Sequence, residues 1–243
     1  MVTVTQIYFD DRDAIWKSYV EKAIAYDSMN NVTKELDAMG YIAGTGDTVA
    51  DRIATGYGMT YTYNLAGMRV TELDPESAAL GLTWSMRYTY DYLGRLVSVT
   101  DALSQTTTYT YDLKGNLLSQ TDDLGHTSYL EYNCRGLLLR KVSPGGRTGT
   151  PGAYTYDPTA VISYTYDALG NTLTRTDRNG NTTVFEWDVH GNLVSQAIGA
   201  NEISYTYDNN GNVLTMTDSL GTTTRVYDEF NCGLDDAHGP IHL

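Results

Sequence analysis

The sequence of 243 residues has little cysteine and proline, and it has no long apolar run. Its two cysteines, Cys134 and Cys232, are too few for the dense disulfide framework of small secreted domains, and either a bridge or two free thiols is compatible with them. No stretch approaches the roughly 20 apolar residues that span a bilayer. The first residues also lack the basic start and apolar run of a signal peptide. We therefore expect no membrane span and no signal peptide in this chain.

Positive charge is also scarce, because 16 Lys and Arg stand against 30 Asp and Glu and leave a formal net charge of -14. A field of this sign repels the phosphates of nucleic acids and anionic membrane surfaces. The basic residues do not cluster into the kind of groove in which aromatic side chains stack on bases. The composition therefore argues against a nucleic-acid-binding protein.

What the chain has in abundance is tyrosine and glycine. The sequence contains 21 Tyr against 3 Phe and 3 Trp, together with 23 Gly and 5 Pro. Such a composition is typical of strands joined by glycine turns and disfavours a helical bundle. A chain of this length also suits a single all-β unit.

An internal repeat is the strongest signal in the sequence. Residues 88–101, YTYDYLGRLVSVTD, align without a gap with residues 109–122, YTYDLKGNLLSQTD. Further copies begin at Tyr164, Phe185 and Tyr205, and degenerate copies begin near Tyr26, Tyr61 and Tyr129. The pattern predicts an N-terminal flank or cap (1–23), a repeat strip (24–228) with inserts at about 72–86 and 143–162, and a C-terminal tail (229–243).

Each repeat predicts a hairpin and two strands from its residue types. The two tyrosines are two residues apart and therefore share one face of a strand. The Asp that follows favours a type I turn, and the Gly three residues later supplies a positive φ and a bulge. The predicted turn-forming residues are Asp91, Gly94, Asp112, Gly115, Asp167, Gly170, Asp188, Gly191, Asp208 and Gly211.

The residues after the turn predict a strand with unlike faces, because an apolar residue three positions past the glycine is followed by Ser or Thr in most repeats. A second turn is expected at Asp101, Asp122, Asp177 and Asp218. Two strands in each repeat make a continuous antiparallel meander, which should curve because strand twist accumulates.

The first forty residues fit the repeat less well. Residues 14–23 have apolar spacings of a short amphipathic helix, although their β-branched and aromatic content makes strand pairing nearly as good an interpretation. Asn30 stands at the usual glycine position, and Asp37 with Gly40 stands where a second turn is expected. We expect this region to cap or begin the strip.

The motif Y-x-Y-D-x-x-G-N-L-x-S-x-T-D, present at 109–122 and matched at 164–177 except for Thr172 and Thr174, resembles the YD repeats of the Rhs family. That family includes bacterial polymorphic toxins, cocoon components of insecticidal Tc toxins, wall-associated proteins and teneurins. The resemblance implies an all-β fold in which the repeats form a curved or spiralling β-strip, like a shell. It also implies that the strip is part of a larger or co-assembled protein that is secreted or lies at the cell surface.

No catalytic, cofactor-binding or metal-binding residue is predicted. The Asp-rich turns lack the glycine and glutamate spacing of a calcium loop, and Cys232, His238 and His242 make only an incomplete zinc set. Asp74-Pro75 and Asp235-Asp236 lack the context of the self-cleavage motif known from bacterial relatives, so no protease is expected.

The sequence therefore predicts a non-catalytic scaffold whose partner is a protein, either an enclosed toxin-like segment or further copies of the chain. The alternative is a cell-surface adhesion module in which Tyr109 and Tyr111 stack on glycans. Against that alternative, the tyrosines serve equally well as cross-strand packing.

Overall fold

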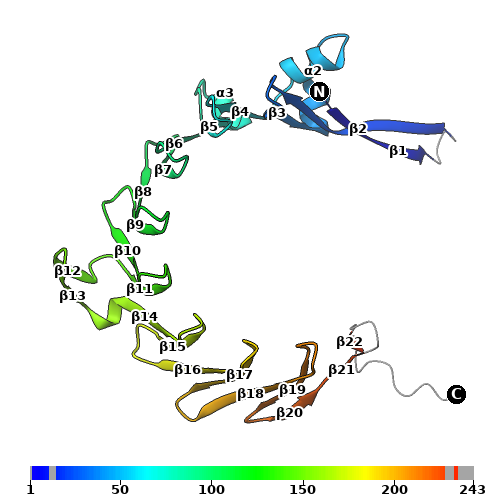
Figure 1. Ribbon diagram of the computed structural model, residues 1–243. Coiled ribbons are helices and arrows are strands. Elements are labelled where there is room, and N and C mark those ends of the chain that lie inside the picture. The colour runs from blue at the N-terminus through cyan, green and yellow to red at the C-terminus, as the bar shows by residue number, and fades with distance from the viewer. Residues whose placement is uncertain (1, 11–14, 228–232, 235–243) are drawn as a thin grey trace, which may run out of the picture. The chain divides into compact units, whose positions relative to one another are not determined.

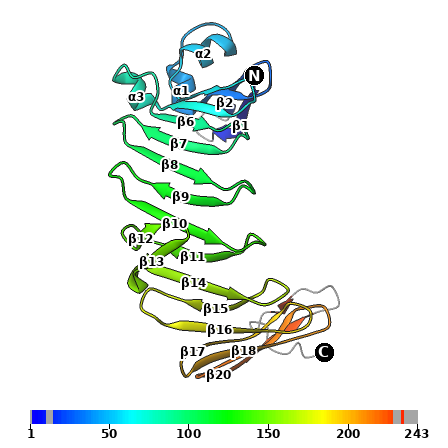
Figure 2. The same cartoon turned by 60° about the vertical axis from the view of Figure 1, so that its left-hand side comes forward.

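The protein is a repetitive antiparallel β-meander, which confirms the all-β prediction (Figure 1, Figure 2). The computed structural model describes the backbone of residues 2–10, 15–227 and 233–234, and nearly all side chains of 20–227. The chain divides into two compact units, the first comprising residues 1–110 and 120–125 and the second comprising 111–119 and 126–243. Each unit is described by itself.

In unit 1, consecutive strands pair antiparallel in chain order. These strands are β1 (Val2–Asp10), β2 (Ile15–Tyr26), β3 (Val32–Asp37), β4 (Met59–Tyr63), β5 (Arg69–Leu73), β6 (Met86–Tyr90), β7 (Leu96–Asp101) and β8 (Thr106–Tyr111). Helices α1 (Ala38–Ala43) and α2 (Val49–Thr55) separate β3 from β4, and α3 (Pro75–Ala79) separates β5 from β6. Residues 15–26 are therefore a strand, so the helical alternative for 14–23 was wrong there.

The second turn expected at Asp37 and Gly40 was also wrong, because a helix begins there. The Asp37 side chain accepts a hydrogen bond from the Gly40 N–H at 2.8 Å and caps α1. An aspartate that can start a turn can equally cap a helix, since both use its carboxylate to accept backbone N–H groups. A side chain at position 40 would lie 2.0 Å from the Tyr57 carbonyl oxygen, so glycine permits the close approach of these two segments.

Unit 2 continues the same pattern. Its strands are β9 (Leu117–Thr121), shared with unit 1, followed by β10 (Thr127–Tyr132), β11 (Leu138–Val142), β14 (Val161–Tyr166), β15 (Thr172–Thr176), β16 (Thr182–Trp187), β17 (Leu193–Ile198), β18 (Asn201–Tyr207), β19 (Val213–Asp218) and β20 (Gly221–Thr224). A separate hairpin, β12 (Arg147–Thr150) with β13 (Ala153–Tyr156), and the 3-10 helix η1 (Pro158–Ala160) lie between β11 and β14. A short pair, β21 (Val226–Tyr227) with β22 (Gly233–Leu234), follows.

Period-two alternation gives the sheet of each unit two different faces. We define the hydroxyl face as the one carrying the Thr between the two repeat tyrosines. There, cross-strand hydroxyls are hydrogen bonded, as between Thr89 and Ser98 at 2.6 Å and between Thr206 and Thr215 at 2.6 Å. We define the tyrosine face as the opposite one, where Tyr205 pairs with Met216.

Fully buried apolar side chains are few. Among the described residues they are Ala23, Leu36, Ile53 and Val142. Most of the sheet is thus one layer thick, and its stability must come from contacts within and between neighbouring repeats. None of the described helices is long and apolar enough to cross a membrane.

Candidate functional site: the repeated turn and its tyrosine ladder

The first turn of each repeat has one geometry, which the segment after β6 illustrates. The Asp91 N–H donates to the Arg95 carbonyl at 2.9 Å, and the Gly94 N–H donates to the Asp91 carbonyl at 3.0 Å. Gly94 has φ of 79°, and the strand register shifts beside Tyr90. This is a type I turn with a glycine bulge. Gly115, Gly170, Gly191 and Gly211 have φ between 85° and 102° in the equivalent turns.

Asn30 occupies the glycine position of the turn between β2 and β3. Its φ is 66°, and its N–H donates to the Asp27 carbonyl at 3.1 Å. Asparagine is among the few residues besides glycine that adopt this left-handed region readily. The repeat therefore extends to the first hairpin after β2.

The aspartate side chain ties each turn together. In the turn of Asp112, one carboxylate oxygen accepts the Lys114 and Asn116 N–H groups at 2.8 Å each, and the other accepts the Asn116 side-chain amide at 2.8 Å. The hydrogen bond from the Asn116 side chain is the main cause that lowers the pKa of Asp112, and the two backbone bonds add to it. The carboxylate therefore stays ionised in its role as acceptor.

The residue after the glycine was not singled out from the sequence, although it recurs as asparagine. Its side-chain amide donates to the turn aspartate in the repeats of Asp167, Asp188 and Asp208, at 2.8 to 2.9 Å. Arg95 takes the same part in its own turn, where its Nε lies 2.7 Å from Asp91. The recurrence of asparagine directly after the turn glycine was the sequence signal that could have identified this contact.

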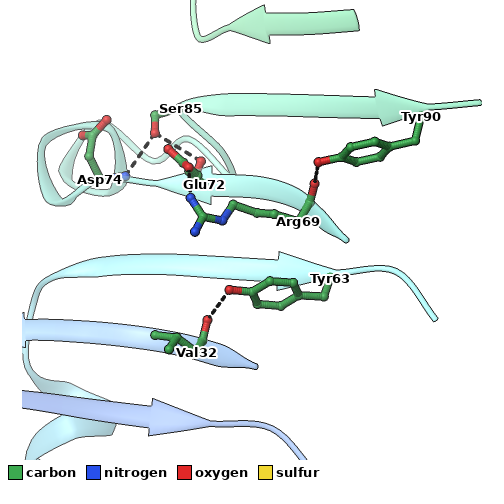
Figure 3. Close-up of polar contacts among 7 residues, drawn as sticks. All are labelled: Val32, Tyr63, Arg69, Glu72, Asp74, Ser85 and Tyr90. Carbon is green, nitrogen blue, oxygen red and sulfur yellow. Dashed lines mark hydrogen bonds and ion pairs between the residues drawn. The ribbon is translucent and has the colours of Figure 1, made fainter. Parts of the chain in front are cut away.

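The second tyrosine of the repeat binds the backbone of the preceding repeat. The Tyr63 hydroxyl donates to the Val32 carbonyl at 2.8 Å, and the Tyr90 hydroxyl donates to the Arg69 carbonyl at 2.7 Å (Figure 3). In both cases the acceptor lies two residues past the residue at the turn's glycine position. We call this recurring bond the tyrosine ladder.

The ladder recurs in unit 2. Tyr166, Tyr207 and Tyr227 donate to the carbonyls of Leu138, Leu193 and Val213 at 2.7, 2.6 and 3.0 Å, and the Trp187 indole N–H donates to the Thr172 carbonyl at 2.7 Å. Burial raises the pKa of Tyr166 and Tyr207, so both hydroxyls remain donors at neutral pH. The repeats that carry one of these donors are thus joined to the repeat before them by a side-chain bond as well as by strand pairing.

The two tyrosines considered for glycan stacking lie in β8. Tyr109 and Tyr111 are half-buried and alternate with the exposed Thr108 and Thr110. Tyr111 precedes Asp112 and so has the sequence position of the ladder tyrosines. Their role in glycan stacking stays a prediction.

A polar cluster lies where β5 leads into α3. The Arg69 guanidinium forms an ion pair with Glu72 (Figure 3). It also lies 4.5 Å from the centroid of the Tyr61 ring. The Ser85 hydroxyl donates to the Glu72 carbonyl and accepts from the Asp74 N–H, both at 3.1 Å. Nearby, burial and then the charge of Glu72 raise the pKa of Tyr88 to about 12. These contacts fix the start of the helical segment between β5 and β6.

The described part of the chain contains no metal-binding cluster and no pair of neighbouring cysteines. No group of three or more His, Cys, Asp or Glu side chains there could hold a metal ion. Cys134 is exposed in the turn after β10, whereas Cys232, His238 and His242 lie outside the described residues. The pairing of the two cysteines therefore stays open.

A comparison with protein families identifies the same repeat region. The family model described as Teneurin YD-shell matches residues 10–227, and no curated protein sequence matches the chain. A crystal structure of TcdB2-TccC3-Cdc42 has 16% sequence identity and a TM-score of 0.46, with 95% of this chain and 16% of that chain covered. A structure of the Photorhabdus luminescens Tc holotoxin pore has 19% identity and a TM-score of 0.42, with 94% of this chain and 15% of that chain covered. The chain thus spans about one sixth of those proteins' length. Since the family match extends over most of its residues, the chain belongs to the Teneurin YD-shell family.

Proposed function

We propose that this chain is a non-catalytic structural scaffold, a segment of a YD-repeat shell or surface protein. Its role is to enclose or display another polypeptide, or to assemble with copies of itself. The observation that carries the proposal is the tyrosine ladder, which joins successive repeats through the same donor and acceptor positions. The recurrent Asp and Asn side chains hold each turn, and the Tyr side chains join one repeat to the next.

A wall built in this way needs no thick hydrophobic core. Each repeat contacts its neighbours, so that stability is a sum of local terms and the length of the strip is set by the number of repeats. The proposed strip comprises residues 24–228, with inserts near 72–86 and 143–162, a flank at 1–23 and a tail at 229–243. Its proposed setting is a secreted or cell-surface assembly.

A protection assay tests the scaffold role. Reduced, carboxymethylated α-lactalbumin serves as a permanently unfolded probe, and its digestion by trypsin is followed with and without an excess of the full chain. A scaffold that encloses polypeptide should slow the digestion, whereas an equal mass of serum albumin should not. Unchanged digestion, combined with light scattering that shows compact monomers at every concentration, contradicts the proposal.

A second candidate function is carbohydrate binding, which one surface feature of unit 2 favours. A groove between the turns that follow β16 and β18 is lined by Tyr205, Tyr207, His190, Asn209 and Asn210, among others. Rings beside amide and imidazole groups are a combination that sugars can use for stacking and hydrogen bonding. A glycan array without hits removes this candidate. If a glycan is bound, Tyr205→Ala should reduce its retention by the chain. Replacing both Tyr109 and Tyr111 by Ala tests whether those tyrosines bind it instead.

A further inference from the structure

The hairpin β12–β13 is a separate element of unit 2. Among the described residues its two strands pair only with each other, from Arg147 with Tyr156 to Thr150 with Ala153. The large sheet is not interrupted by this insert, because β11 pairs directly with β14. The hairpin lies beside β10 and β11 (Figure 2). It is therefore held to the sheet by side chains and by its base, without a backbone ladder.

The base of the hairpin is fixed. The Ser143 N–H donates to the Ala160 carbonyl at 2.8 Å, and the Asp157 N–H donates to the Gly146 carbonyl at 2.9 Å. A side chain at position 146 would lie 2.4 Å from the Ala160 Cβ, so glycine permits the close contact of these two segments. A movement of the hairpin relative to the sheet would thus take place in residues 147–156.

One carboxylate receives the polar contacts of the hairpin. The Tyr156 hydroxyl donates to Glu131 at 2.5 Å, and the Arg147 guanidinium lies 3.7 Å from the same carboxylate. Within the described part of the chain, no other hydrogen bond or ion pair joins the side chains of 147–156 to the sheet. The side chains of Arg147 and Glu131 are 16% and 20% exposed, so both charges are largely removed from water and depend on each other.

Ring contacts complete the docked face of the hairpin. The Arg147 guanidinium lies 3.3 Å from the centroid of the Tyr129 ring in β10 and 4.0 Å from that of Tyr154 in the hairpin. On the opposite face Thr148 and Thr155 are exposed, and their hydroxyls are bonded to each other at 2.7 Å. The hairpin therefore presents one face to the sheet and the other to water.

A second arginine shares the carboxylate. Glu131 stands where other repeats have the Thr of the hydroxyl face, and its cross-strand partner Arg140 lies 3.1 Å from it. Arg140 belongs to the sheet and Arg147 belongs to the hairpin, so the charge of Glu131 offsets one cation on each side of the contact. Without that charge the two guanidinium groups repel each other, because like charges at short range in a partly desolvated site destabilise the contact.

We propose that residues 147–156 form a flap that undocks from the hydroxyl face without unfolding of the sheet, and that Glu131 keeps it docked. Opening uncovers the Tyr129 ring and the Glu131 carboxylate, which the hairpin contacts when it is docked. An isolated two-stranded hairpin is only marginally stable in water, so the flap loses its own strand pairing once it leaves the sheet. This inference goes beyond the scaffold function and does not depend on it.

Hydrogen–deuterium exchange of the full chain, measured by mass spectrometry, tests the flap. Glu131→Gln keeps the size of the side chain and removes its charge. Glu186→Gln makes the same change at the equivalent repeat position of β16, where the side chain is exposed, and is the matched control. We expect amides of 147–156 to exchange about tenfold faster in Glu131→Gln than in the parent, since a bond to a charged group is lost and local opening becomes easier.

A second change tests the reason for the opening. Arg140→Gln added to Glu131→Gln removes the repulsion between the two guanidinium groups, so exchange in 147–156 should become slower again. Exchange of β10 and β11 should stay at the parent rate in all variants, and Glu186→Gln should match the parent throughout.

Three outcomes overturn the proposal. Unchanged exchange of 147–156 in Glu131→Gln means that this carboxylate does not keep the flap docked. Faster exchange that extends equally into β10 and β11 means that the hairpin opens only together with the sheet. Exchange that stays as fast after Arg140→Gln is added contradicts the role of Glu131 as the charge that offsets both arginines.

Discussion

The tyrosine ladder makes a sharp prediction at Tyr207. Its hydroxyl donates to the Leu193 carbonyl at 2.6 Å, whereas Tyr205, two residues earlier on the same face, has no hydroxyl partner among the described residues. Tyr207→Phe removes one hydrogen bond and keeps the ring. Tyr205→Phe removes a hydroxyl of the same kind without breaking a bond, and is thus the matched control.

The magnitude follows from the environment of the bond. A net intramolecular hydrogen bond contributes about 0.5–1.5 kcal/mol, and a carbonyl left without a partner in a fully buried site costs about 1–3 kcal/mol. Tyr207 is only half-buried, so water can reach the Leu193 carbonyl after the change. We therefore expect Tyr207→Phe to lower the free energy of unfolding by about 1 kcal/mol.

Urea unfolding followed by far-UV circular dichroism measures this difference. The Tyr207→Phe midpoint should fall with an unchanged slope, while the Tyr205→Phe midpoint should stay within error of the parent. Equal midpoints for the two variants refute the idea that the ladder bond joins the repeats.

Three further changes test the turn, its carboxylate and the core. Gly211→Ala should cost about 1 kcal/mol because of the positive φ, and Gly211→Asn should cost less since Asn30 adopts this conformation in its own turn; equal urea midpoints for these two variants argue against backbone strain. Hydrogen bonds from Asn212 lower the pKa of Asp208. The stability that this carboxylate contributes is therefore present above about pH 4 and is lost as the pH falls through its folded pKa. In melting curves recorded across pH, the melting temperature of Asp208→Ala should fall less on acidification than that of the parent. Leu36→Ala should cost about 2–5 kcal/mol because the side chain is fully buried, whereas Leu65→Ala should have little effect because that side chain is 98% exposed; similar melting temperatures for the two variants contradict the core described for unit 1.

Local chemistry explains which features could be read from the sequence. The turn at Asp112 and Gly115 depends on residues within one short segment, and each residue type favours the observed conformation by itself. The helix after Asp37 escaped the same reasoning, because the aspartate's preference to accept N–H groups does not distinguish a turn from a helix N-terminus. The docking of α1 and α2 on Leu36 depends on tertiary burial that no repeat pattern encodes.

The tyrosine ladder was hidden for a different reason. Its acceptors are backbone carbonyls, such as that of Leu193, which every residue possesses and which no sequence pattern marks. Only the donor recurs visibly, and a strand tyrosine is expected for its packing alone. The preference for asparagine after the glycine was visible, but its bond to the aspartate required the turn geometry.

The indole of Trp187 serves in the ladder where other repeats use a phenol. The joint between repeats therefore tolerates a change of ring, provided that a donor projects to the same carbonyl. Because this carbonyl belongs to the backbone, any repeat can follow any other without a matched pair of side chains. Duplication or loss of a whole repeat leaves each new junction with the same donor and acceptor. The length of the strip can therefore change during evolution without compensating substitutions in a core.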